Sequence, residues 1–228
     1  MTLNELTGRT TDHLIFEENT NRYFHKDIYQ DYLRLKSEAL QQGIELYVLS
    51  SFRSFENQLT IWNKKARGER TLLDDDGNAL RYADMSPNEV LFSILRWSAL
   101  PGASRHHWGT DIDFVDKKTW PEGYDVQLIP SEFNEGGHFS KFRNWFDHSI
   151  DNNNGFGFFR PYQRDLQGVA PEMWHLSHKD ISAKLLSAYS MDLFRAHLQA
   201  LDPSQIELHS EIVNNQEEIY NRFVINIS

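Results

Sequence analysis

The stretch from Ser104 to Asp113, which reads SRHHWGTDID, is the densest group of potential metal ligands in the chain. His106 and Asp113 stand seven residues apart within it, with Gly109 between them. At that separation an imidazole and a carboxylate cannot share one helix face, but they can converge where a loop bends back into a strand, and Gly109 can supply the bend. Histidine and aspartate both bind zinc, so a third protein ligand with one open position would complete a catalytic metal site.

The residues that follow Gly109 predict the strand that carries one of these ligands. From residue 110 to residue 115, polar and apolar side chains alternate with the period of two that is typical of a half-buried strand. The alternation places Asp111 and Asp113 on one face of this strand. Thr110, Ile112 and Phe114 lie on the other face.

A second stretch, PEMWHLSHK at residues 171–179, also alternates and predicts another strand. His175 is the natural candidate for the third ligand, which gives a set of His106, Asp113 and His175 with water in the fourth position. Glu172 is then the unligated carboxylate. It could take a proton from the water and later give it to a leaving amine, as metal-assisted amide hydrolysis requires.

Upstream elements are expected to position these groups. The apolar run after Ile44 predicts a central strand that leads to Ser50 and Ser51. Ser54 can cap a helix over residues 55–66, which leaves Arg53 at the junction between strand and helix, where a plain surface cation is the alternative interpretation.

Further elements follow from periodicity and capping signals. We expect helices over residues 21–42, ended by Gly43, and over residues 87–97, capped by Ser86 and Glu89. A turn is expected at residues 74–77. Later in the chain the pattern predicts a helix at 139–150, a short strand at 156–159, a helix at 181–201, a helical stretch after 202–203, and a final strand in RFVINI.

Composition limits the classes of partner and compartment. The chain has 228 residues, a net charge of −10 and no run of Lys or Arg longer than a pair, so we expect no nucleic-acid partner. It has no cysteine, which excludes disulfides, thiolate zinc sites and cysteine nucleophiles. The N-terminus lacks the pattern of a signal peptide and no stretch is long enough to span a bilayer. We therefore expect, as given, a cytoplasmic monomer with no membrane partner, and periplasmic or cell-wall action is the alternative if the chain is trimmed or released.

Four segments together resemble a known family. SRHHWGTDID is similar to the S-x-H-x-x-G-x-x-x-D element, and EMWH to the E-x-W-H element, of the zinc D-alanyl-D-alanine carboxypeptidases. These enzymes belong to a superfamily that includes lysostaphin-type peptidases and hedgehog domains. SFRSFENQ resembles the family's Y-R-S-x-x-x-Q element, with Phe52 in place of Tyr, and GFGFFR, which ends at Arg160, resembles its Y-G-F-x-x-R segment.

The resemblance implies a role for each matching residue. His106, Asp113 and His175 would bind one zinc ion per chain, Glu172 would be the catalytic base, and Arg53 would stabilise the oxyanion. The same resemblance implies a substrate-binding set, in which Ser104 holds the terminal carboxylate, Gln58 supports the pocket and Trp174 shapes its wall.

The expected fold is α+β, with a central antiparallel sheet that carries the zinc on one face and helices that cover the other. We expect a single metallopeptidase domain over residues 1–228, with a core at about 21–180 and a C-terminal extension at about 181–228. The implied reaction is release of terminal D-alanine from peptidoglycan stem peptides or their precursors. Two alternatives stay open: a peptidoglycan endopeptidase with the same site, and a zinc-binding module without turnover, against which Glu172 and Arg53 argue.

Departures from the family pattern bear on the substrate. Asp111 replaces a small residue and would add a negative charge close to an anionic substrate. Met173 stands where proline is frequent, and the residues after His175 lack the arginine that many members carry. His107 neighbours a proposed ligand but should point the opposite way, which favours a supporting role or a place in the pocket wall.

Overall fold

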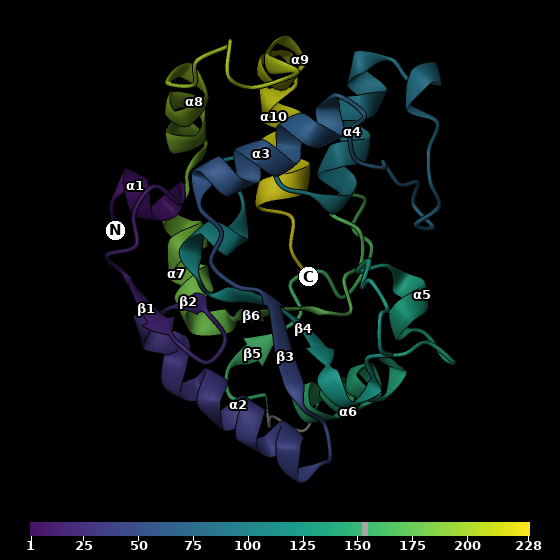
Figure 1. The fold of residues 1–228 in the computed structure, drawn as a ribbon. Helices are drawn as coiled ribbons and strands as arrows, with labels where there is room; N and C mark the ends of the chain where they lie inside the picture. The colour runs from purple at the N-terminus through teal and green to yellow at the C-terminus, as the bar shows by residue number, and fades with distance from the viewer. Residues whose placement is uncertain (152–154) are drawn as a thin grey trace.

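A four-stranded antiparallel sheet in the order β3-β4-β6-β5 lies at the centre of the computed structural model, which describes residues 1–151 and 155–228 (Figure 1). Its strands are β3 (Leu46–Ser50), β4 (Asp111–Asp116), β6 (His175–His178) and β5 (Phe158–Phe159). A separate hairpin joins β1 (Leu14–Glu17) to β2 (Arg22–His25). The expected α+β class with a central antiparallel sheet is confirmed.

Helices surround the sheet on both sides. In Figure 1, α3, α4, α8, α9 and α10 lie above the sheet, and α2 and α6 lie below it. The helices are α1 (Leu3–Leu6), α2 (Tyr29–Gln41), α3 (Phe55–Ala66), α4 (Pro87–Trp97), α5 (Pro130–Phe133), α6 (Ser140–Asp151), α7 (Lys179–Ala188), α8 (Met191–Gln199), α9 (His209–Asn214) and α10 (Gln216–Ile219). A 3₁₀ helix, Arg105–Trp108, precedes β4.

The register between β4 and β6 separates the two faces of the sheet. Ile112 pairs with Leu176, and Asp113 pairs with His175. Because successive side chains of a strand point to opposite faces, the first pair faces one side of the sheet and the second pair faces the other. Ile112 and Leu176 are fully buried against α2 and α6 in an apolar core that also contains Tyr32, Leu35, Phe114, Phe142 and Phe146.

A second core lies among the upper helices. Trp62, Leu91, Ile94, Phe194 and Ile219 are fully buried there and come from α3, α4, α8 and α10. The C-terminal helices therefore complete a core begun by α3 and α4. The expected division into a motif-bearing part and an extension stays a prediction.

Capping residues set where two of the upper helices begin. Ser54 Oγ accepts a hydrogen bond from the Asn57 N–H at the start of α3. Ser86 and Glu89 form a reciprocal capping box at the start of α4. Both starts, and the turn at residues 74–77, agree with the sequence-based expectations.

The helix expected over residues 21–42 is partly wrong. Residues 22–25 form β2, paired with β1, and α2 begins only at Tyr29. Apolar spacing within residues 21–42 cannot reveal this pairing, because the partner strand β1 lies before them in the chain. The hairpin also packs on Gly109, whose carbonyl oxygen accepts a hydrogen bond from the His25 N–H at 2.8 Å.

Several expectations for the C-terminal half also need correction. The strand expected at 171–179 is restricted to β6. The strand expected at 156–159 is restricted to β5, because Phe156 adopts a positive φ of 50°. The helix expected at 181–201 is two helices, because Ser190 caps α8. The first helix after residues 202–203 is α9, which begins at His209.

The final strand expected in RFVINI is wrong. Residues Tyr220–Val224 form a π-helical segment that buries Phe223 and Val224. The Arg222 guanidinium and the Asn226 amide donate to the carbonyls of Gln167 and Leu166. A short apolar run does not distinguish a buried strand from a buried helical turn, and here tertiary packing decides.

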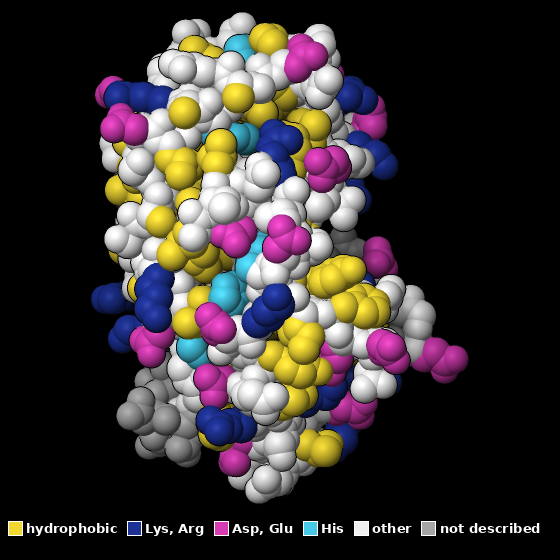
Figure 2. Space-filling view, turned by 90° about the vertical axis from the view of Figure 1, so that its left-hand side faces the viewer, with side chains coloured by type: hydrophobic (Ala, Val, Ile, Leu, Met, Phe, Trp, Pro, Cys, Tyr) yellow, Lys and Arg dark blue, Asp and Glu magenta, His cyan; other side chains and the backbone are white. Residues whose placement is uncertain are grey.

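Charged side chains of both signs are interspersed over the face that carries the β1–β2 hairpin, with apolar side chains exposed between them (Figure 2). Ile15, Phe16 and Tyr23 of that hairpin are among the exposed apolar residues. No helix in the described part of the chain is long and apolar enough to cross a membrane.

Gly109→Ala should destabilise the fold more than a glycine substitution at an open turn. A Cβ at Gly109, whose φ is +70°, would lie 2.6 Å from Leu14 Cδ2 and 2.9 Å from the His25 nitrogen. Gly123→Ala is the matched control, because Gly123 has a φ of +73° and nothing within 4 Å of an added Cβ.

We expect Gly123→Ala to lower the free energy of unfolding by about 1 kcal/mol through backbone strain. Gly109→Ala should lose about 1–3 kcal/mol more through the clash. Urea unfolding of both variants measures the difference, and equal losses would contradict the packing of the hairpin on Gly109.

Candidate metal centre

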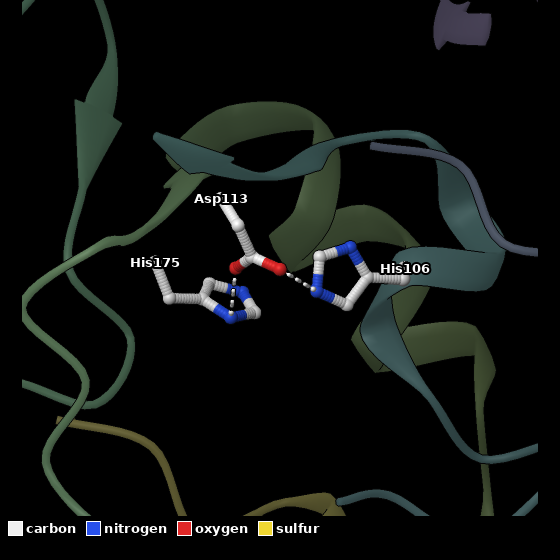
Figure 3. A group of neighbouring side chains, drawn as sticks. All are labelled: His106, Asp113 and His175. Carbon is white, nitrogen blue, oxygen red and sulfur yellow. Dashed lines mark ion pairs between the residues drawn. The ribbon is translucent and has the colours of Figure 1, made fainter. Parts of the chain in front are cut away.

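Three buried side chains converge at one end of the β4–β6 ladder (Figure 3). His106, Asp113 and His175 each offer a ligand atom, and these atoms lie within 4.8 Å of one another. His106 Nε2 is 3.3 Å from Asp113 Oδ2, and His175 Nδ1 is 3.4 Å from Asp113 Oδ1. Among the described residues this is the only such group of three or more potential ligands, and it is the set predicted from the sequence.

Local structure explains why the three residues meet. His106 lies on the 3₁₀ helix that precedes β4, and Gly109 ends this helix in the left-handed conformation before the chain enters the strand. Asp113 then points to the polar face of β4, and the register places His175 directly beside it on β6.

The His106 ring is oriented by a main-chain acceptor. Its Nδ1 lies 2.8 Å from the Ser51 carbonyl oxygen, which can only accept a hydrogen bond. Nδ1 therefore carries a proton, and a ring with a single proton presents the Nε2 lone pair on the side of Asp113. This tautomer has a nitrogen ready to bind a metal.

The His175 ring is held from behind by Asp111. His175 Nε2 is 3.0 Å from Asp111 Oδ1, so Nδ1 is the nitrogen that faces the cluster. Arg105 Nε donates to the same Asp111 oxygen at 2.8 Å, and the Thr110 hydroxyl donates to the other at 2.6 Å. A carboxylate behind a histidine ligand fixes the ring and increases its basicity.

This arrangement changes the interpretation of Asp111. The sequence suggested a negative charge near an anionic substrate, but Asp111 is fully buried and does not line the cavity. Arg105 compensates its charge and is itself fixed by a hydrogen bond to Ser177 Oγ at 2.6 Å. Asp111 therefore acts on His175 and not on the cavity.

The electrostatics of the cluster suit a divalent cation. Burial alone would lower the pKa of His175, but hydrogen bonds with Asp111 and Glu172 and the charge of Asp113 raise it to about 10. Burial opposes ionisation of Asp113, yet His106, His175 and Arg53 hold the pKa of its carboxyl below the usual value. Asp113 Oδ1 is buried without a hydrogen-bond partner. Two imidazoles and a carboxylate with a free oxygen form a zinc-type donor set.

Glu172 and Arg53 lie beside these ligands. Glu172 Oε2 is 2.9 Å from His175 Nδ1. The Arg53 guanidinium donates to Gln58 Oε1 at 2.8 Å and to Ser50 Oγ at 3.0 Å, and its main-chain N–H donates to the His106 carbonyl at 3.0 Å. Burial lowers the pKa of Arg53 and the charges of Asp113 and Glu172 oppose that shift, so the side chain stays cationic.

A cavity of about 760 Å³ opens over this group, and all three potential ligands line it together with Glu172 and Arg53. Ser104 and Trp174 also line the cavity, as expected for residues that contact a substrate. Gln58 does not: it is fully buried, and its Nε2 donates to the Ala99 carbonyl at 2.6 Å. It supports the pocket by holding Arg53.

The structure adds residues that sequence reasoning missed or left open. His107 accepts a hydrogen bond from the Gly102 N–H and lies 2.6 Å from the Arg53 carbonyl oxygen, and burial lowers its pKa to about 3. It is therefore a neutral brace behind Arg53. Tyr162 lines the cavity with its ring 5.1 Å from that of His175; it lies in a loop, where no periodicity could have indicated it.

Solved structures with a similar fold include a D,D-pentapeptidase and an LD-carboxypeptidase. A structure described as VanYB in complex with D-alanine-D-alanine has a TM-score of 0.53 at 20% identity, over 83% of this chain and 89% of that one. A vancomycin resistance D,D-pentapeptidase VanY variant in complex with Zn(II) has a TM-score of 0.52 at 20% identity, over 77% and 86%. The LD-carboxypeptidase LdcB has a TM-score of 0.50 at 18% identity, over 89% and 78%.

Two sequence relatives are uncharacterized proteins of Haemophilus influenzae. One is 38% identical over 98 residues, which cover 42% of this chain and 67% of that protein. The other is 26% identical over 128 residues, which cover 55% and 93%. A family model described as VanY, D-alanyl-D-alanine carboxypeptidase, matches residues 21–181. This match covers most of the chain and includes every residue of the metal centre, so the chain belongs to the VanY family of D-alanyl-D-alanine carboxypeptidases.

Proposed function

We propose that this chain is a zinc-dependent carboxypeptidase that releases the terminal D-alanine from peptidoglycan stem peptides or their precursors. The observation that carries the proposal is the convergence of His106, Asp113 and His175 with an additional carboxylate, Glu172, and a buried cation, Arg53, in one cavity. Membership of the VanY family and the similarity in fold to a structure with bound D-alanine-D-alanine support the choice of substrate.

In this proposal the atoms that would hold zinc are His106 Nε2, an Asp113 carboxylate oxygen and His175 Nδ1. When bound, zinc supplies Lewis acidity to the scissile carbonyl and makes the attacking water more acidic. The protein keeps both imidazoles in the required orientation through Ser51 and Asp111. A rigid donor set of this kind avoids reorganisation during the reaction.

Glu172 moves the proton. Its carboxylate accepts a proton as the water oxygen bonds to the scissile carbon, and it gives the same proton to the amide nitrogen as the C–N bond breaks. The products are the shortened peptide and free D-alanine, so no further reactant is needed. The buried position of Glu172 next to His175 suits this transfer.

Arg53 stabilises the charge that develops on the carbonyl oxygen. A guanidinium fixed by Gln58 and Ser50 needs little rearrangement when the tetrahedral oxyanion forms. Ser104 and Trp174 contact the peptide from the cavity wall. The chain acts as a monomer in this account.

Glu172→Ala should slow hydrolysis strongly while zinc stays bound. Loss of the proton carrier is expected to lower kcat by about 10²–10⁴-fold on D-Ala-D-Ala and on a pentapeptide that ends in it. Free D-alanine is measured, with metal content determined on the same samples. Glu122→Ala, at an exposed carboxylate that does not line the cavity, is the control and should keep full activity.

Absence of D-alanine release by wild-type protein that carries one equivalent of zinc would contradict the proposal. Cleavage within intact peptidoglycan by the same sample would then favour the endopeptidase alternative. Zinc binding without any turnover would favour the binding module.

Asp111→Asn should weaken zinc binding. The change removes the charged acceptor of the His175 Nε2 proton and is expected to lower zinc affinity by about 10–100-fold. Competition with a chelator of known affinity measures this without reference to activity. Ser177→Ala is the matched control, because it removes the other hydrogen-bond partner of Arg105 without touching His175. Equal zinc affinities in Asp111→Asn and wild type would contradict the orienting role.

A further inference from the structure

Two cations that the proposed reaction does not use line the same cavity as the metal ligands. Lys65 is on the last turn of α3, and Arg70 lies just beyond that helix. Gln58, Ile61 and Lys65 follow one another at spacings of three and four residues, which places them on one face of α3. The face that holds Arg53 through Gln58 therefore continues along the cavity wall to Lys65.

The lack of a carboxylate partner distinguishes these two cations from several buried or half-buried arginines. Arg96 has Asp165 at 2.6 Å, Arg105 has Asp111 at 2.8 Å, and Arg160 is paired with Asp147. Among the described residues no carboxylate lies within ion-pair distance of Lys65 or Arg70. The nearby Glu69 is paired with Arg67 at 3.5 Å.

Lys65 is held in place but not neutralised. Its Nζ donates to Ser98 Oγ at 2.9 Å, which uses one of the three protons of the ammonium group. Burial, together with repulsion from Arg70 and Arg53, outweighs the attraction of Glu172 and lowers the pKa of Lys65 to about 8. An ammonium group that its own surroundings destabilise gains most when an external anion binds.

We propose that Lys65, supported by Arg70, forms a subsite that binds a carboxylate of the peptide substrate. This inference rests on the proposed function and extends it, because a carboxylate next to the metal centre would fix the position of the peptide along the cavity. Two of the carboxylates that line the cavity, Asp113 and Glu172, belong to the metal centre and to proton transfer. The other two, Glu69 and Asp125, form no ion pair with Lys65 or Arg70. The anion must therefore come from the ligand, either from the peptide's C-terminus or from an acidic residue upstream.

Binding is tested on zinc-loaded protein that carries Glu172→Ala, so that no turnover is needed. The probe is an acylated peptide that ends in D-Ala-D-Ala and contains one glutamate, and calorimetry measures its Kd. In this background Lys65→Met should raise the Kd by about 10–100-fold, the range expected for a lost hydrogen bond to a charged group. Lys65→Arg should recover most of the affinity. Lys64→Met, an equal charge change on an exposed neighbour that does not line the cavity, should leave the Kd unchanged.

Two modified peptides identify the carboxylate. One has a C-terminal carboxamide, and the other has glutamine in place of glutamate. The peptide that lacks the bound carboxylate should bind weakly to the Glu172→Ala protein, and adding Lys65→Met should cause no further loss. If Lys65→Met lowers affinity equally for both modified peptides and the parent, Lys65 contacts neither carboxylate and the proposal is wrong. An unchanged Kd for the parent peptide in Lys65→Met would also overturn it.

The pH dependence supplies an independent readout. The pKa of Lys65 is about 8 with Glu172 present, and loss of that attraction lowers it further. The affinity of the Glu172→Ala protein for the parent peptide should therefore fall as pH rises toward and through 8. Arginine stays protonated throughout, so the fall should be absent in Lys65→Arg. The charged groups that act on Lys65 are Arg70, Arg53 and Glu172, and the last is absent from the Glu172→Ala protein. The same fall in both proteins would contradict the subsite.

The two proposals can fail separately. No hydrolysis by wild-type protein, together with a Lys65-dependent Kd, would reject the carboxypeptidase function and keep the subsite. Hydrolysis by wild-type protein, together with a Kd that does not depend on Lys65, would keep the carboxypeptidase function and reject the subsite.

Discussion

In the β4–β6 ladder Asp113 lies directly opposite His175, and the whole metal centre depends on this pairing. A slip of one residue would turn Asp113 into the apolar core and expose Ile112 in its place. The register is held because Ile112 and Leu176 are fully buried on the other face of the same two strands. The hydrophobic effect on one face of the sheet thus fixes the geometry of the metal ligands on the other.

The polar face of the sheet is stable only because its charges are compensated. Arg105, Asp111, His175 and Ser177 form a connected network of hydrogen bonds that is almost entirely excluded from solvent. Removing one member of such a network leaves a buried charge without a partner, which costs more than the lost bond itself. The cavity side differs, because Arg53 and Lys65 have only neutral hydrogen-bond partners. Charges with a partner of opposite sign support the metal ligands, whereas cations without a carboxylate partner line the cavity.

Much of the metal centre could be predicted from the sequence, because its information is local. The bend at Gly109, the alternation that follows it, and the spacing between Glu172 and His175 each indicate a position on a short element. The supporting residues could not be found this way. Asp111 contacts His175 from the neighbouring strand, and His107 contacts the main-chain carbonyl of Arg53. Lys65 faces the cavity only because α3 packs beside it. The β1–β2 hairpin and the helical C-terminus were missed for the same reason, since packing against distant residues decides them.

One zinc ion is expected to bind between His106, Asp113 and His175. The most direct test is a crystal structure of zinc-loaded protein with anomalous diffraction measured on both sides of the zinc absorption edge. We predict one strong anomalous peak about 2.0–2.2 Å from His106 Nε2, His175 Nδ1 and an Asp113 oxygen. A peak elsewhere, or coordination through His175 Nε2, which would require Asp111 to release that nitrogen, would contradict the account.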